Sequence, residues 1–184
     1  QVTDPSVLFT SGNSREVIGS CTSVSLDGHR ALMTEIQALV AEGAGGSPRR
    51  TTSGLDYSRV SMVIAVLQAH LHLDLARQDV YVSTVGGAKT VEPAADLAIA
   101  LAIASAARRK PLLPGTVALG EVGLTSEVRA CSGLDRRLSE ASRLGWRRAL
   151  VPASQLSDAS VPKGMDVVGV TTLQDAVRHV LGVM

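Results

Sequence analysis

Aromatic residues are scarce in this chain, since Phe, Trp and Tyr together make up 2% of its 184 residues. A core of the size that this length supports is therefore expected to consist of Val, Leu, Ile and Ala, with closely packed helices. Cysteine is rarer still, with two residues. Cys21 and Cys131 have no C-x-x-C spacing, which argues against a cysteine metal site and indicates small core residues in a reducing, cytoplasmic compartment.

Signatures of membranes, nucleotides and metals are also missing. No apolar run approaches membrane-spanning length and no signal-peptide pattern is present, so no membrane partner is expected. The phosphate-binding loop Gly-x-x-x-x-Gly-Lys-Ser/Thr is absent, so we expect no ATP cofactor in this chain. The histidines lack His-Glu-x-x-His spacing, and no metal site is predicted at His29, His70, His72 or His179. A net charge of +1 does not indicate a nucleic-acid partner by itself, so local clusters of arginine decide that question.

The pattern of apolar residues predicts interleaved strands and helices. Residues 1–15 contain turn signals and are expected to be a linker, with one domain over 16–184. Strands are expected within 16–40, with a hairpin turn at Asp27-Gly28, and at 79–84, 149–151 and 167–170, with two more around Gly123 between 116 and 130. Helices are expected at 58–71, 94–107, 134–144 and 172–181, and a Gly-rich loop at 41–53. These elements predict a mixed α/β (α+β) fold in two layers.

Three segments in the second half of the chain resemble the proteolytic domain of the Lon family. They are Glu92-Pro93-Ala94-Ala95-Asp96, Gly120 to Arg129, and Ser132-Gly133-Leu134-Asp135-Arg136-Arg137. In that family the first segment supplies a serine nucleophile and the last a lysine base. Here Ala94 occupies the serine position and Arg137 the lysine position. The resemblance implies the Lon proteolytic-domain fold, which is similar to domain 2 of ribosomal protein S5.

The two replacements remove the chemistry of a Ser-Lys dyad. Alanine has no nucleophile, and arginine stays protonated where a buried lysine can become a neutral base. Three other serines lie near these positions, and each would need a new base and a new geometry: Ser105, Ser126 and Ser132. We therefore expect no catalytic residues in this chain.

One branch of the Lon-like group is a closer match over the whole chain. Segments in the same order and spacing resemble the C-terminal domain of the RadA (Sms) family of bacterial DNA-repair ATPases: Glu35 to Val40, Pro48 to Arg50, Gly54 to Val60, Glu92 to Ala98 and Gly120 to Thr125. The resemblance implies that the chain is a fragment, and that an N-terminal ATPase core and a zinc motif supply the sites for ATP, magnesium and zinc. It also implies a hexameric helicase that acts with RecA in homologous recombination and branch migration. The Lon-like domain would be its oligomerisation scaffold and DNA-contact platform.

Cationic residues gather in three places that could contact DNA phosphates. Arg49, Arg50 and Arg59 flank the Gly-rich loop, where arginine suits phosphate oxygens and carboxylates of a neighbouring subunit equally well. Lys89 follows a Gly-Gly pair. Arg136 and Arg137 lie in the densest cationic segment, 129–148, where a basic helix face is expected.

Three functions therefore remain open from the sequence. The first is a non-catalytic domain that assembles a RadA-type ring and contacts single-stranded or branched DNA. The second is an active Ser-Lys peptidase of the Lon family, and the third is a pure protein-interaction module. Oligomer number, preferred DNA structure and the partner surface do not follow from the sequence.

Overall fold

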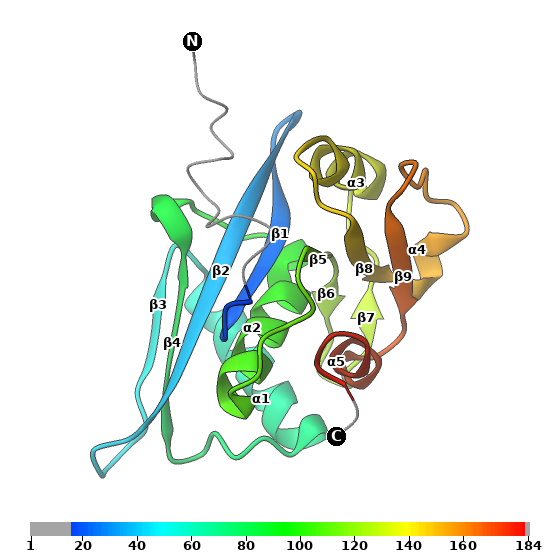
Figure 1. Ribbon diagram of the computed structural model, residues 1–184. Coiled ribbons are helices and arrows are strands. Elements are labelled where there is room, and N and C mark those ends of the chain that lie inside the picture. Colours follow the sequence, from blue (N-terminus) through cyan, green and yellow to red (C-terminus); the bar gives the residue numbers. More distant parts are fainter. Residues whose placement is uncertain (1–15, 183–184) are drawn as a thin grey trace.

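The computed structural model describes residues 16–182 (Figure 1), and the predicted linker at 1–15 lies outside them. The strands are β1 (Ser20–Asp27), β2 (Arg30–Glu42), β3 (Arg50–Ser53), β4 (Gln78–Thr84), β5 (Thr116–Ala118), β6 (Glu121–Val122), β7 (Val128–Arg129), β8 (Arg148–Pro152) and β9 (Asp166–Val170). The helices are α1 (Tyr57–Leu71), α2 (Asp96–Arg108), α3 (Leu134–Arg143), α4 (Ala153–Leu156) and α5 (Leu173–Leu181). Short 3-10 turns are η2 (Val85–Gly87) and η3 (Pro93–Ala95).

A seven-stranded sheet forms the centre of the molecule, with the strand order β3-β4-β2-β1-β5-β8-β9 (Figure 1). Strand β2 is antiparallel to both β1 and β4, and the remaining neighbours are parallel. The predicted turn at Asp27-Gly28 is confirmed, because Asp27 pairs with Arg30 and Gly28 has a φ of 58°. Strands β6 and β7 form a separate two-stranded sheet. The predicted mixed α/β class is confirmed.

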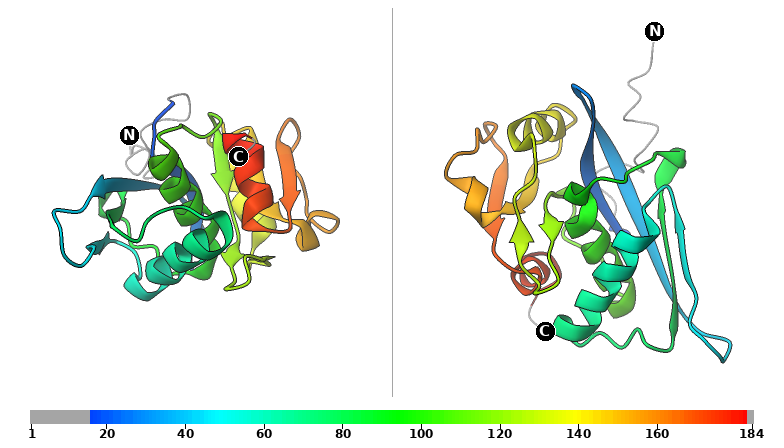
Figure 2. Two further views of the ribbon diagram at one scale, coloured as in Figure 1. Left: turned by 90° about the horizontal axis from the view of Figure 1, so that it is seen from below. Right: turned by 180° about the vertical axis from the view of Figure 1, so that it is seen from behind.

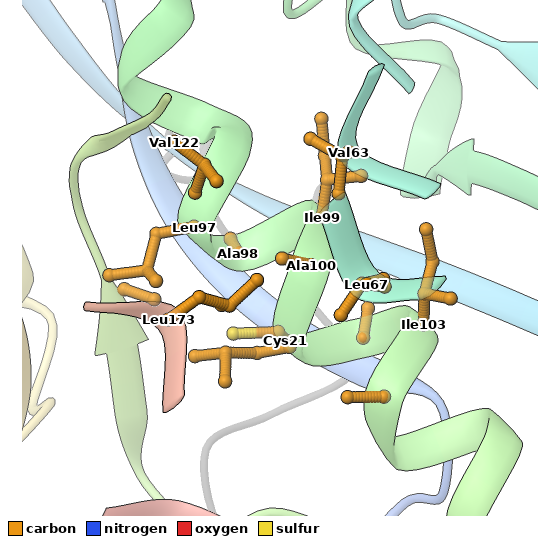
Figure 3. Packing of buried hydrophobic residues seen from close by; sticks show 14 of the residues in the cluster. Cys21, Val63, Leu67, Leu97, Ala98, Ile99, Ala100, Ile103, Val122 and Leu173 are labelled. Atoms are coloured by element: carbon orange, nitrogen blue, oxygen red, sulfur yellow. The ribbon is translucent and has the colours of Figure 1, made fainter. Parts of the chain in front are cut away.

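The larger core lies between the sheet and helices α1, α2 and α5 (Figure 2). Helix α2 is buried along almost its whole length because it lies between the sheet and α1. Its alanines allow this close approach, and leucines and isoleucines fill the remaining space, as Figure 3 shows for Leu97, Ile99 and Ile103. The expectation of a core built from Val, Leu, Ile and Ala is confirmed.

A second, smaller core lies on the opposite face of the sheet. Successive residues of β8 point to opposite faces, so Ala149 and Val151 join the smaller core while Leu150 joins the larger one. Helix α3 packs on β1 and β2 on this side, and α4 packs on β8 and β9. The two predicted layers therefore become three where α3 and α4 cover the sheet. Cys21 and Cys131 are free and buried, one in each core, as predicted for small core residues.

The structure departs from the predicted elements in three places. The predicted loop at 41–53 contains the end of β2 and all of β3, which is a polar strand stabilised by parallel pairing with β4. Residues 116–130 form three short strands rather than two. Helix α4 was not expected, and the predicted helix at 94–107 begins as the 3-10 turn η3 before α2.

Candidate functional site

The two positions that correspond to the peptidase dyad lie in the same part of the molecule. Ala94 is in η3, directly before α2, and its side chain is buried in the smaller core with Leu134 and Leu138 of α3. Its carbonyl accepts a hydrogen bond of 2.9 Å from the amide of Gly120. The structure therefore brings together the segment before α2, the segment around Gly120 and helix α3.

Arg137 is fully buried, with 0% of its side chain exposed, and it forms an ion pair with Glu92. Its NH1 and NH2 groups donate to Oε1 and Oε2 of Glu92, both at 2.8 Å. Nε donates to the carbonyl of Ser132 at 2.8 Å and NH1 to the carbonyl of Val24 at 2.5 Å. Glu92 also accepts the amide of Leu26 at 3.0 Å. One guanidinium and one carboxylate thus join β1, the segment before α2 and the start of α3.

This arrangement corrects one predicted site residue. Arg137 was expected to contact DNA, but a fully buried guanidinium whose donors are occupied by Glu92, Ser132 and Val24 cannot reach a phosphate, so that prediction is wrong. A signal for its burial was present in the sequence. Arg137 lies three residues after Leu134 and one before Leu138, within the inward-facing stripe of α3.

None of the neighbouring serines has a base beside it within the described residues. Ser105 is fully buried, accepts the amide of Gly19 at 2.9 Å and donates to the carbonyl of Lys110 at 2.6 Å, so it connects chain segments. Ser126 is buried and donates to Gln174 at 2.6 Å. Ser132 is exposed, and its carbonyl holds Arg137. A nucleophile activated by Lys, His or a carboxylate is therefore not formed by these residues.

Arg59 is occupied by acidic side chains. Its Nε donates to Oδ1 of Asp96 at 2.9 Å, its NH2 contacts Oδ2, and Glu121 lies 3.7 Å away. Burial raises the pKa of Asp96, while the Arg59 guanidinium and the amide of Val122 oppose that rise, and the hydrogen bond to Asp96 raises the pKa of Arg59. This pair joins the starts of α1 and α2, and it neutralises the charge that was predicted to meet DNA.

Arg50 is used for structure as well. Its guanidinium donates to the carbonyls of Gln78 and Leu75, the latter at 2.7 Å, and so joins β3 to the segment that leads into β4.

The positive charge of the expected basic face around α3 is also largely neutralised. Three arginines on α3 or in nearby strands form ion pairs: Arg129 with Glu121 and Glu127, Arg143 with Glu140, and Arg148 with Asp166.

Three predicted DNA-contact residues are exposed and have no side-chain hydrogen bond or ion pair within residues 16–182: Arg49, Lys89 and Arg136. They do not form one cluster. The carbonyl of Arg49 accepts the amide of Val80 near the start of β4, whereas Lys89 follows the other end of that strand. Arg136 lies on α3, which packs on β1 and β2 over the smaller core.

Sequence reasoning missed two residues of this region. Glu92 belongs to the quoted motif, but the motif gave no sign that it pairs with Arg137. Arg77 lies in an ordinary loop between α1 and β4, and the pairing of β4 with both β2 and β3 brings it near the Gly-rich loop and Arg49. Within the described residues, no group of three His, Cys, Asp or Glu side chains is placed to hold a metal ion, and no helix is long and apolar enough to cross a membrane.

Comparison with known proteins places this geometry in a family. Residues 55–155, which include Glu92, Ala94 and Arg137, match the family model described as subunit ChlI of Mg-chelatase. The chain is 41% identical over 182 residues to a DNA repair protein RadA of Halalkalibacterium halodurans, covering 99% of this chain and 40% of the relative. It is 45% identical to that of Mycobacterium tuberculosis and 42% identical to that of Bacillus subtilis, again over 182 residues and 99% of this chain. The chain spans 37% and 40% of those two relatives.

Proposed function

Since the chain belongs to the family described as subunit ChlI of Mg-chelatase and matches DNA repair protein RadA over nearly its whole length, we propose that it is the non-catalytic Lon-like domain of a RadA-type DNA repair protein. In this role it assembles the protein into a ring and contributes DNA contacts. The observation that carries the proposal is the ion pair between Arg137 and Glu92 beside Ala94. Ala94 takes the position of the peptidase nucleophile, and Arg137 takes the position of the base.

The wider function is proposed for a full-length protein of the same kind as the longer RadA relatives. It would be a hexameric, DNA-dependent ATPase and helicase that acts in homologous recombination and branch migration together with RecA. ATP, magnesium and zinc would bind outside this chain, in an N-terminal core and zinc motif. The matched relatives are DNA repair proteins, which supports the DNA-repair part of this proposal.

We expect no peptidase activity from this chain. A casein or fluorogenic-peptide substrate should show no turnover, because alanine cannot attack a carbonyl and a guanidinium held by Glu92 cannot accept a proton. Introducing Ala94→Ser together with Arg137→Lys should also leave turnover at background, since Glu92 would keep the new lysine protonated. Substrate turnover by the unaltered chain that is lost on mutating one serine would establish the peptidase alternative instead.

Helix α1 offers a surface suited to self-association. Its exposed positions carry no charge and are Tyr57, Ser58, Met62, Ala65 and Ala69. By contrast, the exposed positions of α3 include Asp135, Arg136 and Arg143. Charged residues are depleted where protein interfaces are buried, so α1, which lies on the outside of the molecule in Figure 2, is the helix that we expect to meet a second copy.

The variant Ala65→Glu tests this surface. A carboxylate in the middle of the uncharged stripe should raise the dissociation constant of the assembly by roughly tenfold or more, because desolvating an unpaired charge costs several kcal/mol. Sedimentation velocity measures the change. Ser139→Glu, at an exposed position of α3, adds the same charge and should leave the assembly intact. If both variants and the unaltered chain have the same sedimentation coefficient, α1 does not form the contact between copies.

DNA contact is assigned to the three predicted cations whose side chains have no hydrogen bond or ion pair within the described residues: Arg49, Lys89 and Arg136. The seven residues of β4 separate the first two by about 20 Å at the usual rise per residue. A duplex of that length carries about 12 phosphates, so separated cations can contact one DNA molecule. If the chain assembles but binds no DNA at low salt, the protein-interaction module becomes the better description.

A further inference from the structure

A hollow of about 280 Å³ lies at the end of the sheet where β2 ends and β3 and β4 begin. It is lined by the Gly-rich segment 43–48 together with Arg49, Arg77 and Asp79. The amide of Gly43 donates to the carbonyl of Arg77 at 3.3 Å, and the amide of Arg49 donates to Oδ1 of Asp79 at 2.7 Å. These backbone links hold both arginines beside the glycines.

The charges of this hollow are not balanced. Arg49 and Arg77 are exposed and form no ion pair or side-chain hydrogen bond within the described part of the chain. Asp79 is the one acidic lining residue; it is 8% exposed and uses Oδ1 to hold the loop. Two guanidinium groups and one carboxylate leave a net charge of +1 on the lining. Such a surface favours an anion.

The glycines add hydrogen-bond donors to this charge. The amides of Gly45 and Gly46 make no hydrogen bond within residues 16–182. Both residues have a positive φ, 90° and 97°, and a Cβ built on either would meet nothing within 4 Å, so the backbone is open on this side. Free amides beside arginines are the groups that bind phosphate oxygens in proteins.

We propose that this hollow is a phosphate site in which Arg49 and Arg77 hold one phosphate group of a nucleic-acid backbone, with the amides of Gly45 and Gly46 as further donors. The inference rests on the proposed DNA contact and extends it, because it adds Arg77 and gives Arg49 a partner in binding. Contacts of this kind position a protein on DNA without reading its sequence.

DNA binding by single variants tests the pair directly. Arg49→Ala and Arg77→Ala should each weaken binding of a short labelled duplex by roughly tenfold, the usual size of a charge-assisted contact. Each should flatten the slope of log K against log salt by about 0.9. Lys163→Ala removes the same charge from an exposed position in another loop and should change neither quantity. Asp79→Asn keeps an oxygen for the amide of Arg49 and should strengthen binding.

Titration with inorganic phosphate separates this site from the DNA proposal. The amide resonances of Gly45 and Gly46 should shift with phosphate but not with chloride at equal ionic strength, and they should stay in place in the Arg49→Ala/Arg77→Ala double variant. Unchanged DNA affinity in the variants, or no phosphate shift in the unaltered chain, would overturn the phosphate site while leaving DNA binding elsewhere intact. Phosphate shifts without any DNA binding would keep the site, assign it to free phosphate compounds and overturn the DNA contact. A fall in assembly mass with unchanged DNA affinity would place both arginines in a subunit contact and overturn the site.

Discussion

Replacing Arg137 with alanine should lower the free energy of unfolding by about 3 kcal/mol or more, because it leaves the Glu92 carboxylate without its partner and empties a buried volume. Denaturant unfolding followed by circular dichroism measures this. Arg136→Ala, one residue earlier and exposed, should change stability by less than about 0.5 kcal/mol.

A second pair of variants separates the charge from the packing. Arg137→Met combined with Glu92→Gln should recover much of the loss, because an apolar side chain of similar length replaces the ion pair and the glutamine oxygen still accepts the amide of Leu26. A loss below about 1 kcal/mol in Arg137→Ala would show that the ion pair is not the main connection between β1 and α3.

DNA binding should fall roughly 150-fold when salt rises from about 50 to 200 mM, if Arg49, Arg77, Lys89 and Arg136 each contact a phosphate and the slope is about −3.6. The triple variant Arg49→Ala, Lys89→Ala, Arg136→Ala should lose most of the affinity for every sequence alike, and its slope should fall to about −0.9, the contribution of the remaining Arg77.

The control for this experiment removes the same amount of charge from paired arginines. Arg143, Arg148 and Arg178 each have an acidic partner at 2.8 to 3.4 Å, so their replacement by alanine leaves the free cations in place. We expect the control to keep a slope near that of the unaltered chain. Equal losses in both triple variants would show that net charge, rather than these three positions, governs binding.

Local patterns in the sequence were enough to predict the main turn and helices around the site. The Asp27-Gly28 turn, the apolar stripe of α1 and the small residues of α2 each depend on near neighbours, and all three appear in the structure. The family resemblance assigned Ala94 and Arg137 to the two dyad positions, and in the structure Ala94 packs with α3, which carries Arg137.

The partners of charged side chains could not be predicted in the same way. Arg59, Arg50 and Arg137 each bond to atoms at least 25 residues away, so sequence neighbours gave no sign that their charges are used internally. Strand β3 was missed for a related reason. Its sequence is polar, and its conformation follows from pairing with β4 across the intervening helix α1.

Sedimentation velocity of the chain with a labelled DNA duplex at low salt tests the central claim most directly, because one experiment reports both assembly and DNA contact. The account of a non-catalytic scaffold that binds DNA predicts a boundary heavier than one chain, with the labelled duplex sedimenting in it and leaving it as salt is raised. A chain that sediments as a monomer at high micromolar concentration, with all of the duplex free, would contradict it.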